Sequence, residues 1–169
     1  MRKFMICSAV TVCLNLTAWF TTFVSSGSAS TPSPRFLLHE GEVFDQKTKL
    51  TWKRCTAGTT WKKGVGCVGS PKLMRLEDAV QLAQNFGNGW RVPTIEELWS
   101  IVDQEHTNPA IDSKVFPDVK NVDEGAPYWS VTRMKEMPSL LYYIDFFDGL
   151  VDGHSEGFLM RVRLVHGNE

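Results

Sequence analysis

The chain has 169 residues, a formal net charge of −1, 43% hydrophobic residues and 22% charged residues. This balance is typical of a soluble globular domain, and it excludes a disordered tail, a collagen and a multi-span membrane protein. The charge is nevertheless divided along the chain. From Arg35 to Arg91 there are ten Lys or Arg against five Asp or Glu, a net of +5; from Glu96 to Glu169 there are six against fourteen, a net of −8.

The first 29 residues have the order of a secretory signal. Arg2 and Lys3 precede a stretch without charge from Phe4 to Val24, and the small-residue run Ser25–Ala29 follows. A cationic start, an apolar middle and a small-residue end are typical of a signal that a peptidase removes. We therefore expect residues 1–29 to be cleaved, with no stable membrane insertion afterwards and export to the periplasm, the cell surface or the medium. The alternative is an uncleaved anchor, because the uncharged stretch approaches the roughly 20 residues of a membrane helix.

The remaining chain is long enough for one domain. About 140 residues are left, of which 30–35 form a proline-containing linker and 36–169 can bury a single core. Two cysteines remain, Cys55 and Cys67. Because thiols oxidise in an exported protein, we expect one disulfide, with a redox or metal role as the alternative. A zinc site needs further ligands at short spacing and the four histidines are scattered, so we expect no metal.

The first elements of the domain are a hairpin and a loop. Val43–Asp45 and Leu50–Trp52 are β-forming runs on either side of the polar segment Gln46–Lys49, which predicts a β-hairpin. The next stretch, Cys55–Pro71, contains four glycines and no sustained hydrophobic period. We expect it to be a loop held by the disulfide.

Two helices follow. Apolar residues recur at helical spacing from Leu76 to Phe86, and Gly87 stands where a helix can end. A second helix is expected to begin at Thr94, because Thr94 and Glu97 have the spacing of a capping box. Its expected apolar face consists of Ile95, Leu98, Trp99 and Val102.

The last third is predicted to consist of a long loop and strands. Residues 104–126 are polar and broken by prolines, which indicates a loop. Strand patterns cover 128–132, 140–147 and 158–165, and in the last of these Arg161 and Arg163 alternate with apolar residues. Between the last two strands, Asp148-Gly149 and Asp152-Gly153 are turn signals. Strands that flank a pair of helices predict an α+β domain.

Several short motifs together resemble the Lcl C-terminal domain family of exported bacterial proteins. They occur in the order of that family and span roughly Val43 to Val165. The motifs are Asp45 with Leu50–Cys55 (LTWKRC), Trp61, Cys67, Gly89–Leu98 (GWRVPTIEEL), Phe116-Pro117, Tyr128–Thr132 (YWSVT), Asp145-Phe146 before an Asp-Gly turn, and Val162–Val165 (VRLV).

The resemblance implies a C-type-lectin-like fold, related to that of the formylglycine-generating enzymes. We therefore expect a single domain with two helices, antiparallel strands, long loops and one disulfide. The named member of the family ends a surface adhesin and binds sulfated glycosaminoglycans. Likeness of fold is a weak guide to ligand.

A basic stretch without carboxylates is the main candidate binding surface. Between Gln46 and Leu76 there are eight Lys or Arg and no Asp or Glu. Cations that pair with anionic groups, next to an indole that stacks on a sugar, would suit an anionic glycan or cell-envelope polymer. The alternative is a solvated lysine-rich surface. The expected ligand-binding residues are Lys53, Arg54, Trp61, Lys62, Lys63 and Lys72, with Lys47, Lys49 and Arg75 completing the stretch.

The segment Trp90–Thr94 is expected to be structural. Pro93 fixes the backbone before the Thr94 cap, and Trp90 suits the core. Arg91 is expected to form an internal ion pair, with Asp145 as a suitable partner, rather than to contact ligand. Glu97 completes this structural motif through the capping box.

Metal and catalytic roles have less support. The acidic stretch with Asp145, Asp148, Asp152, His154 and Glu156 offers hard oxygen ligands for calcium, but its spacing does not match known loops and turn chemistry explains it. No hydrolase, metalloprotease or phosphate-binding motif occurs, and no cysteine follows Cys67 where the formylglycine-generating enzymes carry a reactive pair.

The sequence therefore predicts an exported, non-catalytic binding module for an anionic polysaccharide, with no cofactor. Nucleic acid is not expected as a partner, because the exported part is net acidic. The alternative is a protein-partner module, an envelope assembly subunit or an inhibitor of an exported enzyme, that uses the loop over residues 104–126.

Overall fold

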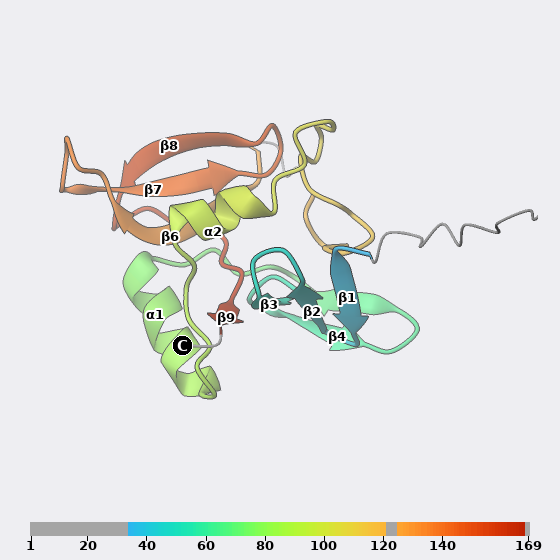
Figure 1. Ribbon diagram of the computed structural model, residues 1–169. Helices are drawn as coiled ribbons and strands as arrows, with labels where there is room; N and C mark the ends of the chain where they lie inside the picture. The colour runs from blue at the N-terminus through green and yellow to red at the C-terminus, as the bar shows by residue number, and fades with distance from the viewer. Residues whose placement is uncertain (1–33, 121–124, 168–169) are drawn as a thin grey trace, which may run out of the picture. The chain divides into compact units, whose positions relative to one another are not determined.

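The structure, a computed structural model, describes residues 34–120 and 125–167 (Figure 1). The predicted signal, residues 30–33 of the linker and the last two residues lie outside the described part. The described elements are, in chain order, β1 (Phe36–His39), β2 (Glu42–Asp45), β3 (Leu50–Lys53), β4 (Thr59–Lys62), β5 (Gly66–Gly69), α1 (Leu76–Phe86), α2 (Ile95–Ser100), β6 (Pro127–Arg133), β7 (Leu140–Asp145), β8 (Leu150–Ser155) and β9 (Val165–Gly167).

The first sheet joins the beginning and the end of the domain. Its order is β1-β2-β3-β9, all antiparallel. The predicted hairpin is confirmed as β2–β3, and its turn forms around the buried Asp45, whose carboxylate accepts Lys47 N–H and Thr48 Oγ1–H at 2.9 Å each. Arg35, which the sequence assigns to the linker, makes a 2.7 Å ion pair with Asp45. The contacts of the first sheet therefore include Arg35.

The segment expected to be a loop after Cys55 contains a second hairpin, β4–β5. The prediction of a loop was wrong because its glycines stand at the ends of strands rather than interrupting them. Gly66 and Gly69, at the two ends of β5, have φ of +103° and +104°, a region that favours glycine. The Cys55–Cys67 disulfide is present and joins the segment after β3 to β5.

Helix α1 matches its predicted bounds. Leu76, Ala79 and Ala83 form its buried face, and Gly87 ends it at φ +66°. Phe86 was expected on the buried face, but it is 53% exposed.

Helix α2 begins with the predicted capping box. Thr94 accepts the backbone N–H of Glu97, and the Glu97 carboxylate accepts the backbone N–H of Thr94 at 2.8 Å. The buried residues of this helix are Ile95 and Leu98, whereas Trp99, which was expected on the same apolar face, is 46% exposed.

The third sheet has the order β6-β7-β8. Strands β6 and β7 match the predicted runs, whereas β8 was not predicted. Asp148-Gly149 does form a turn, with Gly149 at φ +81°, but Asp152-Gly153 lies inside β8 and pairs with Tyr143 and Tyr142. The pairing of β8 with β7 overrides the turn signal, and the missing β-carbon at Gly153 leaves room for the Met134 side chain.

The C-terminal stretch differs most from its prediction. Residues 160–165 form isolated bridges instead of one strand, and β9 begins only at Val165. Arg161 and Arg163 are 7% and 0% exposed, so the expected alternation of buried and solvent-facing residues is wrong here. Internal hydrogen-bond partners make the burial of these arginines possible.

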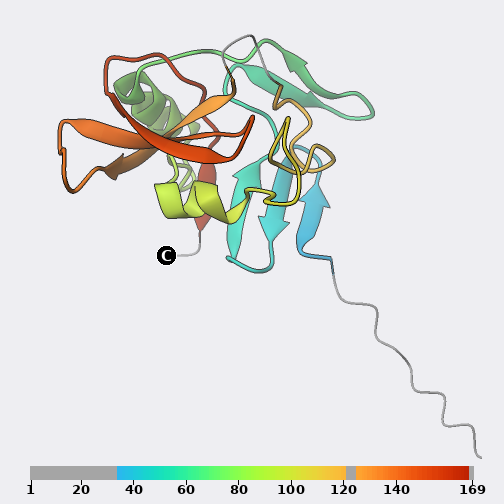
Figure 2. The same cartoon turned by 90° about the horizontal axis from the view of Figure 1, so that it is seen from above.

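Two apolar clusters form the core. One gathers around Trp52, Phe116 and Tyr128 and includes the inner face of α2. The other gathers around Trp129 and Met160 and includes the inner face of α1. Much of the long loop is also part of the core, since Ala110, Ile111, Val115, Phe116 and Val119 are all buried. Seen from above, the tip of the β4–β5 hairpin points away from the β6–β7–β8 sheet (Figure 2).

Candidate functional site

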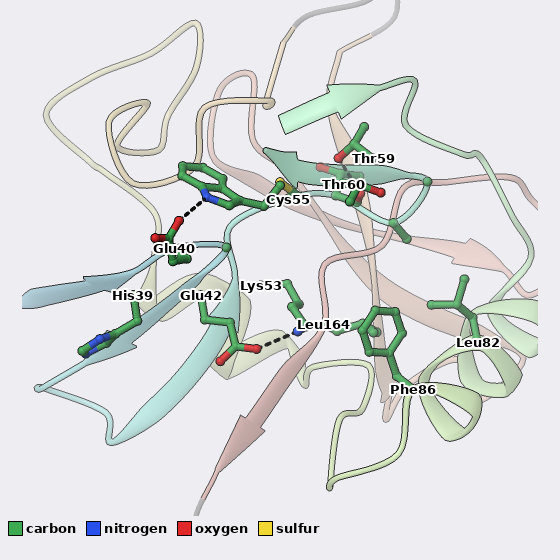
Figure 3. Close-up of a pocket in the computed structure, with 15 residues that line it drawn as sticks. His39, Glu40, Glu42, Lys53, Cys55, Thr59, Thr60, Leu82, Phe86 and Leu164 are labelled. Carbon is green, nitrogen blue, oxygen red and sulfur yellow. Dashed lines mark hydrogen bonds and ion pairs between the residues drawn. The ribbon is translucent and has the colours of Figure 1, made fainter. Parts of the chain in front are cut away.

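A cavity of about 370 Å³ opens between the first sheet, the β4 hairpin and helix α1 (Figure 3). The disulfide, Ala57 and Leu164 supply apolar surface, and α1 supplies Leu82 and Phe86. The polar part of the wall comes from the turn between β1 and β2, from β3 and from β4. Its residues are His39, Glu40, Glu42, Lys53, Thr59, Thr60 and Trp61, with Gly41, Thr56 and Gly58 completing the lining.

An ion pair lies in the wall of this cavity. Lys53 Nζ is 2.7 Å from Glu42 Oε1, and the two residues are direct cross-strand partners on β3 and β2. The same ammonium lies 4.1 Å from the ring centroid of Trp90 and 5.0 Å from that of Phe86. Figure 3 shows Lys53 between the Glu42 carboxylate and the Phe86 ring. The cation is therefore held in place and offers a ligand a fixed charge.

Trp61 also lines the cavity, held on several sides. Its Nε1–H donates to Glu40 Oε2 at 3.2 Å, and the Arg54 guanidinium lies 4.0 Å from its ring centroid. A β-carbon on Gly41 would lie 2.7 Å from Trp61 Cβ, so the glycine makes room for the indole. Because Arg54 covers one face of the Trp61 indole, a ligand can stack only on the uncovered part of the ring.

Arg54 is not the surface cation that the sequence suggested. It is 7% exposed, and its guanidinium donates to the backbone carbonyls of Glu40, Lys114 and Val115 at 2.9 Å each. Burial lowers the pKa of this guanidinium. The side chain ties the edge of the cavity to the long loop, so Arg54 positions Trp61 and is not available to an anionic ligand.

The other three expected ligand residues lie outside the cavity lining. Lys63 is 3.1 Å from Glu40, and this ammonium together with the indole N–H lowers the pKa of Glu40. Lys62 and Lys72 are exposed and have no ion pair among the described residues. Lys72 does border the cavity, because its Cγ would lie 2.7 Å from a β-carbon on the lining residue Gly58.

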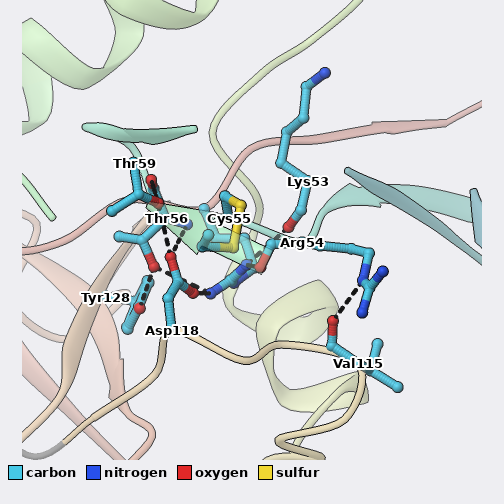
Figure 4. Close-up of polar contacts among 10 residues, drawn as sticks. Lys53, Arg54, Cys55, Thr56, Thr59, Val115, Asp118 and Tyr128 are labelled. Atoms are coloured by element: carbon cyan, nitrogen blue, oxygen red, sulfur yellow. Dashed lines mark hydrogen bonds and ion pairs between the residues drawn. A yellow bond between two sulfur atoms is a disulfide. The ribbon is translucent and has the colours of Figure 1, made fainter. Parts of the chain in front are cut away.

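Beneath the cavity lies a buried polar network around Asp118 (Figure 4). Its Oδ1 accepts Arg163 Nη2–H at 2.8 Å, and its Oδ2 accepts Thr56 N–H at 2.6 Å and Thr59 Oγ1–H at 2.9 Å. Thr56 Oγ1 is 2.6 Å from the Tyr128 hydroxyl. Burial opposes ionisation of Asp118, but the Arg163 charge and these donors hold its pKa below the ordinary value. The network fixes the strand β4 that carries Trp61.

One group of potential metal ligands stands out among the described residues. Atoms of Cys55, Cys67 and Asp118 lie within 4.8 Å of one another. The two sulfurs are bonded to each other, whereas metal coordination requires thiolates. The acidic stretch considered for calcium does not form such a group in the described part of the chain.

The structural motif around Trp90 lies where expected, with one correction. Trp90 and Pro93 are buried, but Arg91 pairs with Glu97 and not with Asp145. The guanidinium and the carboxylate meet through two hydrogen bonds of 2.7 and 2.6 Å. The capping box directs the Glu97 side chain back toward Arg91. Arg91 therefore pairs with Glu97, six residues away in the sequence, instead of with Asp145. Asp145 instead accepts the backbone N–H groups of Ala126 and Phe147.

Sequence reasoning therefore found Lys53 and Trp61 but missed most of the cavity wall. Glu40 and Glu42 lie outside the basic stretch, and Phe86 was assigned to the core by helical period. The pairing of β2 with β3 could have indicated Glu42, because a predicted hairpin places it across from Lys53.

The fold and the cavity together define a small α+β domain with two helices, antiparallel sheets, one disulfide and an amphipathic pocket. The sequence matches the Lcl C-terminal domain over residues 41–166, and the chain belongs to that family. A comparison with curated proteins returns no match. Among the described residues, no helix has the length and apolarity required to cross a membrane.

Proposed function

We propose that the chain is an exported, non-catalytic binding module that recognises a glycan carrying anionic groups, in an adhesion-type role at the cell envelope. The observation that supports this most is the cavity, whose wall combines the aromatic rings of Trp61 and Phe86 with the Glu42–Lys53 ion pair. Ligand pockets typically combine apolar walls with a few fixed polar groups. A sugar ring needs both, because it has an apolar face and a hydroxyl edge.

The charges of the cavity favour a particular placement of such a ligand. Glu40 and Glu42 stand in the wall, so the interior does not favour an anion. The sulfate or carboxylate groups would instead lie at the border, near the exposed Lys72, which contacts the lining residue Gly58, and the exposed Lys62, which follows the lining residue Trp61 on β4. The sugar ring would occupy the cavity, with hydroxyls directed to Glu42 and Lys53.

The proposal extends to the fold class and to the absence of catalysis. A C-type-lectin-like fold is supported by the pairing of the first strands with the last strand, β9, and by the long core-packed loop. A binding role is supported because the reactive side chains in the cavity wall are already bonded to or paired with other residues. Cys55 is in a disulfide, Glu42 is paired with Lys53, and Glu40 is paired with Lys63.

The test measures binding of a sulfated polysaccharide and its desulfated form by calorimetry at low and high salt. We expect Phe86→Ala to weaken binding of both forms, and Lys62→Glu with Lys72→Glu to weaken binding of the sulfated form alone by more than tenfold. The sulfated form should also lose affinity in high salt, because exposed charges are screened within about 10 Å at 0.1 M.

The matched control is Lys47→Glu with Lys49→Glu, in the β2–β3 segment at the other end of β3 from Lys53. It changes the net charge by the same amount without touching the cavity border. Equal losses in the control and in the border variant would reject the site, because overall charge would then explain binding. Unchanged affinity in Phe86→Ala would reject the cavity.

A further inference from the structure

A second hollow, a groove of about 590 Å³, lies against the β6–β7–β8 sheet and shares no lining residue with the cavity. Tyr143 and His154 line it from the sheet. Its apolar wall is made by Leu73, Phe158 and Leu159, which are 54%, 45% and 50% exposed. The Phe158 ring packs on His154 with 3.9 Å between ring centroids. Three large apolar side chains are thus exposed together at one place.

Carboxylates surround this groove. Asp145 lines it, and Asp152 is the cross-strand partner of the lining residue Tyr143. Burial raises the pKa of Tyr143, and the charges of Asp152, Asp145 and Asp148 raise it further. In the described part of the chain, none of the three carboxylates has a cation partner; they accept backbone N–H groups. One cation, Arg161, lines the groove and donates to the Gly125 carbonyl. Asp145 and Arg161 balance each other in the lining, so the negative charge beside this apolar groove comes from Asp152, opposite Tyr143, and from Asp148 in the following turn.

The tip of the β4–β5 hairpin has the opposite character. Lys62 and Lys63 precede Val65, which is 66% exposed. A β-carbon on Gly64 or Gly66 would meet nothing within 4 Å, so the turn is open around these glycines, and Lys63 connects the tip to the domain through its exposed 3.1 Å ion pair with Glu40. No carboxylate occurs in the sequence between Gln46 and Leu76. The tip is a narrow, cationic protrusion with one apolar side chain.

We propose that the hairpin tip of one copy of this chain docks into the groove of a second copy. Val65 would enter between Leu73, Phe158 and Leu159, while Lys62 and Lys63 would approach Asp148 and Asp152. Within one copy, the tip of the β4–β5 hairpin lies away from strands β7 and β8, which carry the groove residues Tyr143 and His154, in both views (Figures 1 and 2). Because the two contacting surfaces differ, a docked pair leaves one free tip and one free groove, so further copies can add to form an open chain or, where the rotation between copies closes, a ring.

The test is sedimentation equilibrium of the domain, residues 30–169, over a wide concentration range at low and high salt. We expect the weight-average mass to rise with concentration without stopping at a dimer, and to fall toward the monomer in high salt. Lys62→Glu with Lys63→Glu, Asp148→Lys with Asp152→Lys, and Phe158→Asp should each weaken association more than tenfold.

Exchanging the charges of tip and groove distinguishes this contact from other modes of association. An equimolar mixture of the two charge-reversed variants should associate again, as should a single chain that carries both pairs of substitutions. Lys47→Glu with Lys49→Glu and Glu105→Lys with Glu136→Lys are controls at exposed positions, and they should associate like the unaltered chain. A monomer at every concentration, or a closed dimer, would overturn the proposal, as would failure of both charge-exchange combinations in variants that retain the native circular dichroism spectrum.

The groove variants also keep this contact distinct from glycan binding. Neither Asp148 nor Asp152 lines the cavity, so Asp148→Lys with Asp152→Lys should bind sulfated polysaccharide like the unaltered chain. Loss of association with retained glycan binding supports the groove contact. Retained association in this variant rejects the contact whatever happens to glycan binding.

Discussion

Asp118 and Arg163 form an ion pair across 2.8 Å, with side chains that are 9% and 0% exposed. The pair joins the long loop to the C-terminal segment, and it also fixes Thr56 and Thr59 at the start of the hairpin. Breaking one partner of a buried pair leaves the other charge uncompensated, which typically costs about 3–5 kcal/mol. This contact is therefore central to both the fold and the position of Trp61.

We expect Asp118→Asn to lower the free energy of unfolding by about 3 kcal/mol, because Arg163 would stay buried without a counter-charge. Chemical denaturation followed by circular dichroism measures this loss. Asp103→Asn is the matched control, since Asp103 pairs with His106 in an exposed place and exposed pairs contribute at most about 1 kcal/mol. Equal losses in the two variants would contradict the central role of Asp118.

The same pair predicts how stability depends on pH. The folded pKa of Asp118 lies below its unfolded value of about 4, and the pKa values of Asp45 and Glu97 are lowered too. A depressed carboxyl pKa stabilises the fold above the unfolded pKa, and this contribution is lost as pH falls through the folded pKa. Stability should therefore decrease below about pH 4.

Asp118→Asn should flatten this acid decrease, because one of the responsible carboxyls is gone. Melting temperatures of the variant and of the unaltered protein, measured from neutral pH to pH 2, should converge as the pH falls. A gap that stays constant over the whole range would show that Asp118 does not titrate with the fold.

The disulfide is expected to stabilise the hairpin side of the cavity. A bridge with a sequence separation of 12 contributes about 3 kcal/mol in the chain-entropy description. Cys55→Ser with Cys67→Ser should lose stability on that scale and should be cut by proteases first within β4–β5. Mass spectrometry of early fragments identifies the site. First cleavage elsewhere in the domain would contradict this role.

The capping box should contribute separately from the nearby ion pair. Thr94→Ala removes the hydroxyl that accepts Glu97 N–H and should cost about 1 kcal/mol. Glu97→Gln keeps an acceptor for the Thr94 backbone but weakens the pair with Arg91. Thr107→Ala, at an exposed loop position, is the control for the loss of a hydroxyl. Thermal unfolding that distinguishes none of these variants from the unaltered protein would refute the cap's contribution.

Sequence patterns correctly predicted the elements that are determined by residues close together in the chain. Helix α1 follows from spacing, the start of α2 from Thr94 and Glu97, and the β2–β3 hairpin from its flanking runs. These features depend on residues within one or two turns of each other. Family motifs and the expected export context pointed to the disulfide.

Long-range contacts account for what the sequence did not predict. Arg163 is buried because Asp118 and the carbonyls of Lys53 and Arg54 meet it, and these partners are 45 to 110 residues away. The β8 strand exists because β7 pairs with it, against the turn signal in its own sequence. Most of the cavity was missed for the same reason, since its wall joins residues from His39 to Leu164.

The fit between Gly41 and Trp61 has a consequence for sequence variation. Any side chain at position 41 would meet the first atoms of the indole, so the two positions are mutually constrained. Related chains that keep an aromatic residue at the Trp61 position should keep glycine at the Gly41 position. Chains without the aromatic ring can also replace the glycine. Joint substitution at positions 41 and 61 would therefore identify family members whose cavity binds a different ligand.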